Sequence, residues 1–484
     1  MKIVCLIVLC ILLFAVLLLL IALVRTLLTR SKTSGYTMPA ADARAARYAK
    51  LLSEMVQCDT TSHDGIAEPE KFAAFHRVLE SLFPAVHDKL EKTVIDGNLL
   101  FYWKGKSSDR PLVLMSHQDV VPAEGEWKYP PFSGEIADGK VWGRGASDTK
   151  CSVMGFFEAV EELLQEGYTP PTDVYLSSSC TEEWAGDGCP KLVAELQRRG
   201  VTPYLVCDEG GGIITDPVAG IGGNFAMVGV FEKGKADVKL TAKSSGGHAS
   251  APKAGSPIAR LSAFVQDVET GKPFRRKMLP EVQSMFEKLA PYARFPLKFV
   301  FGNMWLFKPL LLRVMPALSA QAGAMLQTTM AFTMQSGSDA YNVMPQEATL
   351  GANMRFIPHQ GMQESLEIVR KLAQKHDLAI EVMHASDCSA SVDITGEGFQ
   401  LVESVIAETF PGLPVSPYVM TGATDARFYQ AICGCVVRFA PVIYGPEQMA
   451  GMHGLNENIE YACLPGCVDF YKNLIRRMGD HEKN

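Results

Sequence analysis

The fold is decided by the stretch Pro111-Leu112-Val113-Leu114-Met115-Ser116-His117-Gln118-Asp119, in which a short apolar run ends in polar side chains. An apolar run of this length predicts a strand that is covered on both faces, as in a parallel sheet. In α/β proteins, functional residues follow the carboxyl ends of such strands. His117 and Asp119 stand two residues apart, so an extended backbone directs both side chains to the same side. We therefore expect this strand to deliver His117 to a functional site.

Helical and extended patterns alternate on both sides of this strand. The stretch 150–166 carries apolar residues at helical spacing, and the glycine and prolines that follow would end a helix. The other expected elements are helices over 45–56, 70–82 and 190–199, and extended segments over 98–103, 173–179 and 204–207. This alternation predicts an α/β domain with a mostly parallel sheet and helices on both faces.

The pattern changes from about residue 233. The expected elements are a strand over 236–243, a helix over 257–269, a hairpin over about 328–356, a helix over 362–376 and a strand over 379–384. This β-α-β-β-α-β order is typical of a small α+β sandwich. Candidate functional residues lie before and after the block, so we interpret residues 233–386 as an inserted lid or dimerisation domain. The catalytic domain would then consist of residues 31–232 and 387–484.

Five short stretches carry the residue types of a two-metal hydrolytic centre. They are Ser116–Asp119, Ser147–Lys150, Thr181–Glu183, Cys207–Gly211 and Met452–Gly454. The expected metal ligands are His117, Asp148, Glu183, Asp208 and His453. Asp148 would lie between the ions, Glu183 and Asp208 would each hold one ion, and His453 would complete the set. Structural zinc normally uses closed cysteine-rich sets, and the chain has no C-x-x-C pair, so a catalytic site is favoured.

Two further acids have expected roles beside these ligands. Asp119 would orient the imidazole of His117. Glu182 adjoins the ligand Glu183 and would move a proton from water to the leaving nitrogen. Taken singly, each residue has a simpler explanation, because a lone buried histidine is usually hydrogen-bonded core and a Glu-Glu pair is commonly solvated surface. Their combination on strand ends favours the metal site.

Composition limits the classes of function. With 46 basic and 53 acidic residues and a net charge of -7, the chain predicts no basic face, so nucleic acid is not an expected partner. Its 12 cysteines are spread singly, and we interpret most of them as small core residues. The alternatives are a metal-linked role for Cys151, Cys180 and Cys207, or a disulfide among the cysteines after residue 430.

An apolar run at the N-terminus, Ile3 to Val24, contains no charged or strongly polar side chain. As a helix it would extend about 33 Å, which is enough to cross a bilayer. The alternative is a cleaved signal peptide, but the nearest small-residue triplet, Ala41-Asp42-Ala43, lies far downstream. We therefore expect residues 1–30 to form a single-pass membrane anchor. Basic residues flank both ends of the run and leave its orientation open, and we expect the catalytic domain outside the cytoplasm.

Six stretches resemble those of the dinuclear zinc metallopeptidase family that includes aminoacylase and carboxypeptidase S. They are Ser116–Val121, Gly143–Lys150, Thr181–Glu183, Asp208–Gly211, Ser245–Ser250 and Met452–Asn456. The resemblance covers nearly all of the chain after the apolar run. The chain is most similar to the branch of carboxypeptidase S and the N-fatty-acyl-amino-acid hydrolase/synthase, with which it shares the segment Trp305–Leu310. The resemblance implies two zinc ions and a cis peptide bond between Asp148 and Thr149.

The resemblance also implies three functional residues in the inserted domain. His248 would reach the active site and stabilise the oxyanion of the tetrahedral intermediate, and in dimeric relatives this histidine comes from the neighbouring subunit. Asn342 and Arg355 would hold the carboxylate of the substrate. Their simpler explanations are a turn histidine, a hairpin asparagine and a solvated arginine. Thr149 stands where many relatives have a second acid, and this departure bears on substrate preference.

These observations predict a membrane-tethered zinc amidohydrolase that cleaves a C-terminal peptide bond or an N-acyl-amino-acid bond and releases a free amino acid. A homodimer is a further expectation. One alternative is a non-catalytic peptide-binding protein, which the intact Glu182 disfavours. Another is an aminopeptidase, which would need acids rather than Arg355 and Asn342 around the substrate.

The stretch 273–325 is longer than the inserted fold needs, and residues 299–315 are rich in large apolar side chains. They could add to a core or form a subunit interface. Alternatively, Trp305, Phe307 and neighbouring leucines could line or gate a pocket for a long acyl chain, since each buried methylene contributes about 0.8 kcal/mol.

Overall fold

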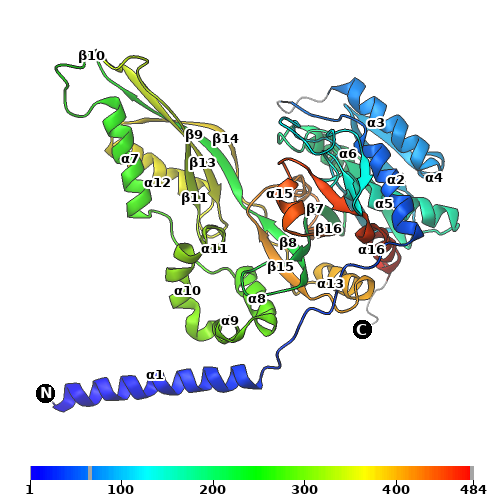
Figure 1. Cartoon of the computed structure of the whole chain (residues 1–484), viewed down its shortest axis with the longest axis horizontal. Helices are drawn as coiled ribbons and strands as arrows, with labels where there is room; N and C mark the ends of the chain where they lie inside the picture. The colour runs from blue at the N-terminus through cyan, green and yellow to red at the C-terminus, as the bar shows by residue number, and fades with distance from the viewer. Residues whose placement is uncertain (1, 64–67, 480–484) are drawn as a thin grey trace.

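The computed structural model describes residues 2–63 and 68–479, which form a large sheet with helices on both faces and a smaller sheet that stands apart (Figure 1). The large sheet has eight strands in the order β1 (Glu91–Ile95), β2 (Asn98–Trp103), β6 (Thr172–Ser178), β3 (Ser107–Met115), β7 (Leu205–Thr215), β16 (Val436–Tyr444), β8 (Asn224–Glu232) and β15 (Val415–Met420).

The centre of this sheet is parallel and its edges are mixed. β3 pairs parallel with β6 and β7, and β7 pairs parallel with β16, which confirms the expected parallel sheet. At one edge, β1 and β2 are antiparallel because only Asp96 and Gly97 connect them, and both residues adopt the positive φ angles of a tight hairpin turn. β8 follows β7 closely and also pairs antiparallel with it.

Alternate side chains of the central strands pack on opposite faces of the sheet. Leu112 and Leu114 of β3 face a core shared with α5 (Lys150–Gln165) and α16 (Leu464–Arg477). Val113 and Met115 face a second core with α6 (Gly188–Arg198) and α14 (Ala426–Tyr429). The remaining elements around this sheet are α2 (Ala43–Val56), α3 (Pro69–Leu82), α4 (Pro84–Lys89), α13 (Glu397–Thr409), α15 (Pro446–Gly451), η2 (Tyr461–Cys463), β4 (Glu135–Ala137), β5 (Lys140–Trp142) and β17 (Asn458–Glu460).

The smaller sheet forms the lid, which we define as residues 234–271 and 329–386. Its four antiparallel strands lie in the order β11 (Thr329–Ser336), β13 (Glu347–Phe356), β9 (Gly234–Lys243) and β14 (Ala379–Ser386). They form a separate core with α7 (Pro257–Gly271) and α12 (Met362–Lys375), and the chain order β-α-β-β-α-β confirms the expected α+β sandwich. β10 (Gly247–His248) and β12 (Val343–Met344) pair at the tip of the lid.

The stretch between α7 and β11 packs against the large sheet. It forms α8 (Pro280–Leu289), η1 (Ala290–Tyr292), α9 (Phe295–Phe301), α10 (Met304–Leu318) and α11 (Ala320–Ala324). α8 lies along β15 at the edge of the large sheet. Phe301 and Met304, from the apolar segment, are buried in the core of the large sheet and not in that of the lid.

The apolar run at the N-terminus forms the helix α1 (Lys2–Leu28). It is long and apolar enough to cross a membrane, and its most apolar window is not buried against the rest of the chain. A membrane anchor and a signal sequence both fit this description.

Candidate metal centre

The side chains of the candidate centre come from the loops after β3 and β6, from within the neighbouring strand β7 and from two loops beside them. His117 follows β3, Glu182 and Glu183 follow β6, Asp208 lies in β7, Asp148 precedes α5 and His453 follows α15. The order β6-β3-β7 in the sheet places the first three of these segments side by side.

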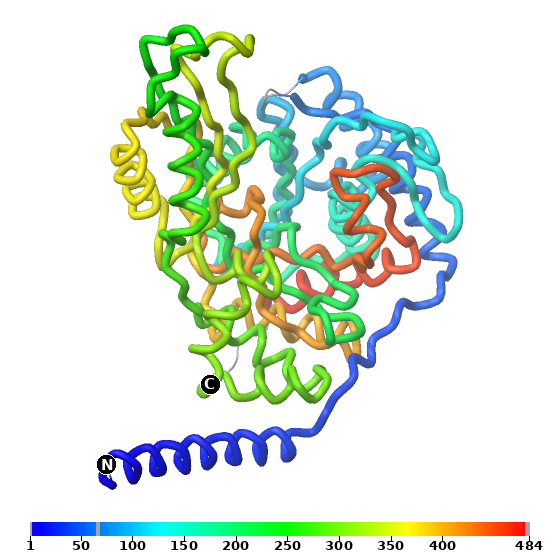
Figure 2. Tube along the Cα trace, turned by 60° about the vertical axis from the view of Figure 1, so that its left-hand side comes forward, coloured from blue at the N-terminus to red at the C-terminus, as the bar shows by residue number. Residues whose placement is uncertain are grey.

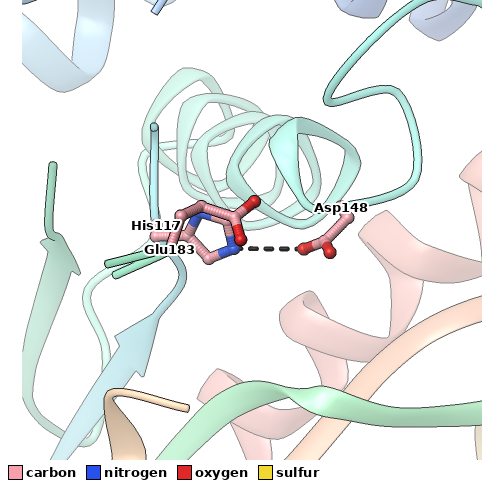
Figure 3. Close-up of side chains that lie close together, drawn as sticks. All are labelled: His117, Asp148 and Glu183. Carbon is pink, nitrogen blue, oxygen red and sulfur yellow. Dashed lines mark hydrogen bonds and ion pairs between the residues drawn. The ribbon is translucent and has the colours of Figure 1, made fainter. Parts of the chain in front are cut away.

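Asp148 lies between the two histidines. Its Oδ1 is 3.1 Å from Nε2 of His117, and its Oδ2 is 3.0 Å from Nε2 of His453. Nε2 of His453 is also 3.0 Å from Oε2 of Glu183. Figure 3 shows how His117, Asp148 and Glu183 converge. One carboxylate thus presents one oxygen to each imidazole, as a carboxylate that bridges two cations must. The Asp148–Thr149 bond is cis, which confirms that expectation.

The donor set fits a metal site. Ligand atoms of His117, Asp148 and Glu183 all lie within 4.8 Å of one another. Oε1 of Glu183 and Oδ2 of Asp208 are buried, and neither has a hydrogen-bond partner among the residues that the structure describes. Buried acceptors without a donor are costly unless a cation compensates them. Imidazole nitrogens and carboxylate oxygens are the ligands found in catalytic zinc sites.

The electrostatics of the site also favour a cation. Burial and the neighbouring Asp148 raise the pKa of Glu183, and burial raises the pKa of Asp208 to about 7. Hydrogen bonds to Asp148 and Glu183 raise the pKa of His453 to about 10. Burial acts to raise the pKa of Asp148, but hydrogen bonds from His117 and His453 hold it below its usual range. Because Glu183 and Asp208 are buried near other carboxylates, their ionised forms are unfavourable until a cation adds positive charge.

Asp119 connects the imidazole of His117 to the glutamate pair. Nδ1 of His117 lies 2.9 Å from the main-chain oxygen of Asp119 and 3.5 Å from its Oδ1. The carboxylate of Asp119 accepts hydrogen bonds from the main-chain N–H groups of Glu182 at 3.1 Å and Glu183 at 3.2 Å. It also accepts one from Oγ of Ser62 at 2.7 Å. The carbonyl is thus the nearer partner of the imidazole, while the carboxylate fixes the loop of the glutamate pair.

Glu182 lies beside the ligands but farther from the imidazoles than Glu183 does. Its Oε2 is 3.9 Å from Nε2 of His117, which is beyond hydrogen-bonding distance. Burial raises its pKa well above the usual value, although the nearby His117 opposes this shift. A carboxyl group set beside a cluster of candidate ligands can accept and return a proton.

Glu457, which was not among the predicted site residues, positions the loop of Asp148. Oε1 of Glu457 accepts hydrogen bonds from the main-chain N–H of Ser147 at 2.9 Å, from Oγ of Ser147 at 3.0 Å and from the main-chain N–H of Asp148 at 2.9 Å. Oε2 accepts from Gly145 at 3.0 Å and from the buried Arg144 guanidinium at 2.7 Å. The signal in the sequence that could have identified Glu457 was its position as an acid four residues after His453.

Glu209 was missed as well. Burial, Asp148 and Asp208 raise its pKa well above the usual value, and His117 opposes the shift. Burial contributes most to the raised pKa of Asp208, and the charge of Asp425 contributes next. Glu209 therefore lies in the electrostatic field of the centre and is a second candidate ligand from β7. Asp208 and Glu209 are adjacent in the sequence, which does not indicate which of the two would be the ligand.

Arg355 lies at the base of the lid. It sits on β13 opposite Lys235 of β9, and its Nε donates to Oδ1 of Asn353 at 3.1 Å. Burial, assisted by the nearby Arg427 of the catalytic domain, lowers its pKa. Lys235 and Arg427 line a cleft together with Trp184, which follows the glutamate pair. Asp237 and Asp387 line the same cleft, so the lid and the catalytic domain bring charged side chains of both signs together here.

His248 and Asn342 lie together at the tip of the lid. The main-chain N–H of Ala249 donates to the main-chain oxygen of Asn342 at 3.0 Å, and Nδ1 of His248 is 2.7 Å from Oγ of Ser250. Both side chains are exposed. Figure 1 shows this tip at the end of the lid farthest from the large sheet. The structure therefore does not bring His248 and Asn342 to the candidate metal ligands of the same chain.

Trp305 and Phe307 do not line the cleft between the lid and the catalytic domain. Trp305 is half exposed on α10, and the ring of Phe307 packs on Phe299 with centroids 5.1 Å apart. The structure thus favours packing and surface roles over the acyl-chain pocket.

Comparisons with known proteins point to one family. The model of peptidase family M20/M25/M40 matches residues 113–477. A Dictyostelium discoideum protein named probable carboxypeptidase S-like 2 is 33% identical over 417 residues, which cover 84% of this chain and 80% of the relative. The Xenopus tropicalis N-fatty-acyl-amino acid synthase/hydrolase PM20D1 is 34% identical over 415 residues, which cover 83% and 80%.

The fold is also similar to solved structures. The M20 family metallo-carboxypeptidase Sso-CP2 from Sulfolobus solfataricus has a TM-score of 0.65 and 18% identity, with 90% of this chain and 100% of that chain covered. Human carnosine dipeptidase 1 has a TM-score of 0.60 and 15% identity, with coverage of 90% and 97%. At these identities, the likeness supports the fold alone.

Proposed function

The chain belongs to the peptidase family M20/M25/M40, whose members are zinc-dependent hydrolases, and from this premise we propose that it releases a free α-amino acid by cleaving an amide bond. The bond would be that of an N-acyl amino acid or the last peptide bond of a short peptide. The names of the relatives describe enzymes of both kinds, and in both reactions the substrate carries a free carboxylate. The observation that carries the proposal is the position of Asp148 between His117 and His453, beside the glutamate pair.

We propose that the centre holds two zinc ions. Asp148 would bridge them, with His453 and Glu183 on one side and His117 with Asp208 or Glu209 on the other. When bound, the ions polarise the scissile carbonyl and lower the pKa of water. The buried Glu182 would take the proton of the attacking water and deliver it to the leaving nitrogen. Asp119 would keep the loop of Glu182 in place through its hydrogen bonds.

The lid would supply substrate binding. The guanidinium of Arg355 can hold a carboxylate with two parallel hydrogen bonds, and it lies near Arg427, which lines the cleft between the lid and the catalytic domain. A guanidinium that holds the substrate disfavours an aminopeptidase, which would have to hold a substrate ammonium. We further propose a homodimer in which His248 and Asn342 act at the site of the neighbouring subunit, because both are exposed at the tip of the lid.

The location of the protein is part of the proposal. We propose that α1 remains on the chain as a single-pass membrane anchor and that the catalytic domain lies outside the cytoplasm. The domains would be residues 31–232 with 387–484 and the inserted residues 233–386, whose segment 273–325 packs against the large sheet.

A released-amine assay tests this function. The substrates are dipeptides and N-acyl amino acids with acetyl, octanoyl and hexadecanoyl groups, each also offered as its amino-acid amide, which lacks the carboxylate. We expect zinc-dependent release from the free acids only. Arg355→Leu should lower kcat/KM for the acids about 10- to 100-fold, the loss of one hydrogen-bonded charge. Arg370→Leu, at an exposed site on α12, is the control. Faster cleavage of the amides, or no release from any substrate with zinc, would refute the proposal.

A further inference from the structure

α10 turns apolar side chains toward solvent. Its buried side carries Met304, Leu311 and Met315. Trp305 and Leu310, which flank its outer side, are 46% and 52% exposed. Exposed apolar side chains that gather on one helix make it a candidate for a surface that a partner covers.

The helix α1 ends against the start of α10. Nδ2 of Asn303, just before α10, donates to the main-chain oxygen of Ala22 at 3.2 Å and to Oγ1 of Thr26 at 2.9 Å. The side chain of Asn303 is fully buried by these contacts. Nζ of Lys298, on α9, donates to the main-chain oxygen of Thr29 at 2.6 Å. The apolar helix is thus fastened to α9 and α10 by polar groups near its C-terminal end.

Among residues 2–63 and 68–479, only this end of α1 touches the rest of the chain. Leu18, Ala22 and Thr26, spaced four residues apart, form the stripe that is shielded, while nearly all other side chains of α1 are exposed. α1 packs against α9, and both views show the N-terminal part of α1 running free of the body (Figures 1 and 2). If α1 crosses a bilayer, α9 and the start of α10 must therefore lie at the level where it leaves the bilayer.

The depth of this contact follows from the sequence of α1. The apolar run ends at Val24, and Arg25 is the first charged residue after it. Ala22 lies two residues inside that end, which at 1.5 Å per residue places its partner Asn303 about 3 Å inside the apolar layer. Nε1 of Trp305 donates to Oδ1 of Asn303 at 3.3 Å. Tryptophan is enriched at this boundary between hydrocarbon and headgroups.

We propose that α9 and α10, residues 295–318, form a second membrane contact, and that a phospholipid bilayer covers the exposed face of α10. The anchor α1 would fix the depth through Asn303 and Lys298, and Trp305 and Leu310 would dip into the lipid beside it. Arg313, which is exposed on the same side of α10, can reach the phosphate groups. This contact depends on α1 remaining on the chain and not on the reaction that the enzyme catalyses.

Quenching of tryptophan fluorescence by brominated lipid tests the contact. The full-length chain is reconstituted in phosphatidylcholine vesicles with and without phosphatidylcholine whose acyl chains carry bromine near the glycerol. The chain has five tryptophans, and Trp184 is 44% exposed beside the cleft, so Trp184→Phe is the matched control for Trp305→Phe. We expect quenching in the wild type and in Trp184→Phe, and its loss in Trp305→Phe.

Two outcomes would overturn the proposal. The first is a wild type that brominated lipid does not quench, or quenching that persists unchanged in Trp305→Phe. The second is the finding that two chains occupy one nanodisc and that Trp305 is shielded from the lipid. A second copy of the chain would then cover the exposed face of α10. The amide-hydrolase assay is scored separately on Glu182→Gln, so failure of the membrane contact and failure of the reaction are distinguished.

Discussion

Replacement of Glu457 by glutamine should disable the centre from a distance, because this buried carboxylate organises the loop of Asp148. Glutamine keeps one carbonyl oxygen, which can still accept from Ser147 and Asp148 in place of Oε1. Its amide nitrogen would then face Gly145 and the guanidinium of Arg144, and both of these are donors. A charge-assisted hydrogen bond at 2.7 Å thus becomes a contact between two donors.

The magnitude follows from burial. Arg144 is 3% exposed and Glu457 is fully buried, so the variant leaves a guanidinium without its counter-charge inside the protein. Removing one partner of a buried ion pair typically costs about 3–5 kcal/mol. In a domain of this size each 1 kcal/mol lowers Tm by about 2–4 °C, so we expect a fall of roughly 10 °C.

Thermal unfolding of the full-length chain in detergent measures this cost, and a zinc titration measures the effect on the centre. Glu460→Gln, three residues along and only partly buried on β17, is the matched control and should change Tm by less than about 1 °C. We expect Glu457→Gln to bind zinc more weakly than the control, since the loop of Asp148 loses its support. A variant that keeps both the wild-type Tm and the wild-type zinc affinity would refute this reasoning.

Three further predictions concern the centre and its surroundings. Glu182→Gln should keep zinc but lose about 100-fold or more in turnover, and a turnover within about threefold of wild type would exclude its role in proton transfer. Chelation of zinc should lower Tm because the ions bind the folded chain, and zinc at 100 times Kd should restore about 2.7 kcal/mol of the free energy of unfolding. A Tm that changes with neither chelator nor zinc would contradict a bound metal. Burial lowers the pKa of His76 to about 4, below its usual 6.5, so stability present above pH 6.5 is lost as the pH falls toward 4, by up to about 3 kcal/mol. Urea unfolding of wild type and His76→Gln over this range should show the difference, and parallel curves would argue against it.

The sequence predicted the local structure well because its patterns are periodic. The apolar run before His117 is β3, and the helical spacing after Asp148 is α5. The approach of Asp148 to His117 and His453 was also predictable, since a strand end pointed to His117 and the family motifs pointed to all three residues. The support from Glu457 was not, because a single acid on a loop carries no pattern that distinguishes a buried acceptor from a solvated side chain.

Two other features depended on tertiary packing. The segment 273–325 lies within the chain segment of the lid, yet it packs on the large sheet, and apolar content alone cannot tell which core a segment joins. The position of Trp305 on the outer side of α10 depends on which side meets α8 and the sheet. His248 shows the same limit at longer range, because its motif does not reveal that the lid holds it away from the ligands of its own chain.

The insertion of the lid between the first ligands and His453 affects how the protein is made. His117, Asp148 and Glu183 leave the ribosome long before His453 and Glu457, which lie near the C-terminal end of the sequence. A nascent chain therefore carries only part of the centre, because His453 is still missing. The loop of Asp148 also lacks its buried acceptor until Glu457 emerges. In the proposed mechanism, hydrolysis can begin only after synthesis has passed the lid and these last residues, so a prematurely terminated chain would be inert rather than a partly active enzyme.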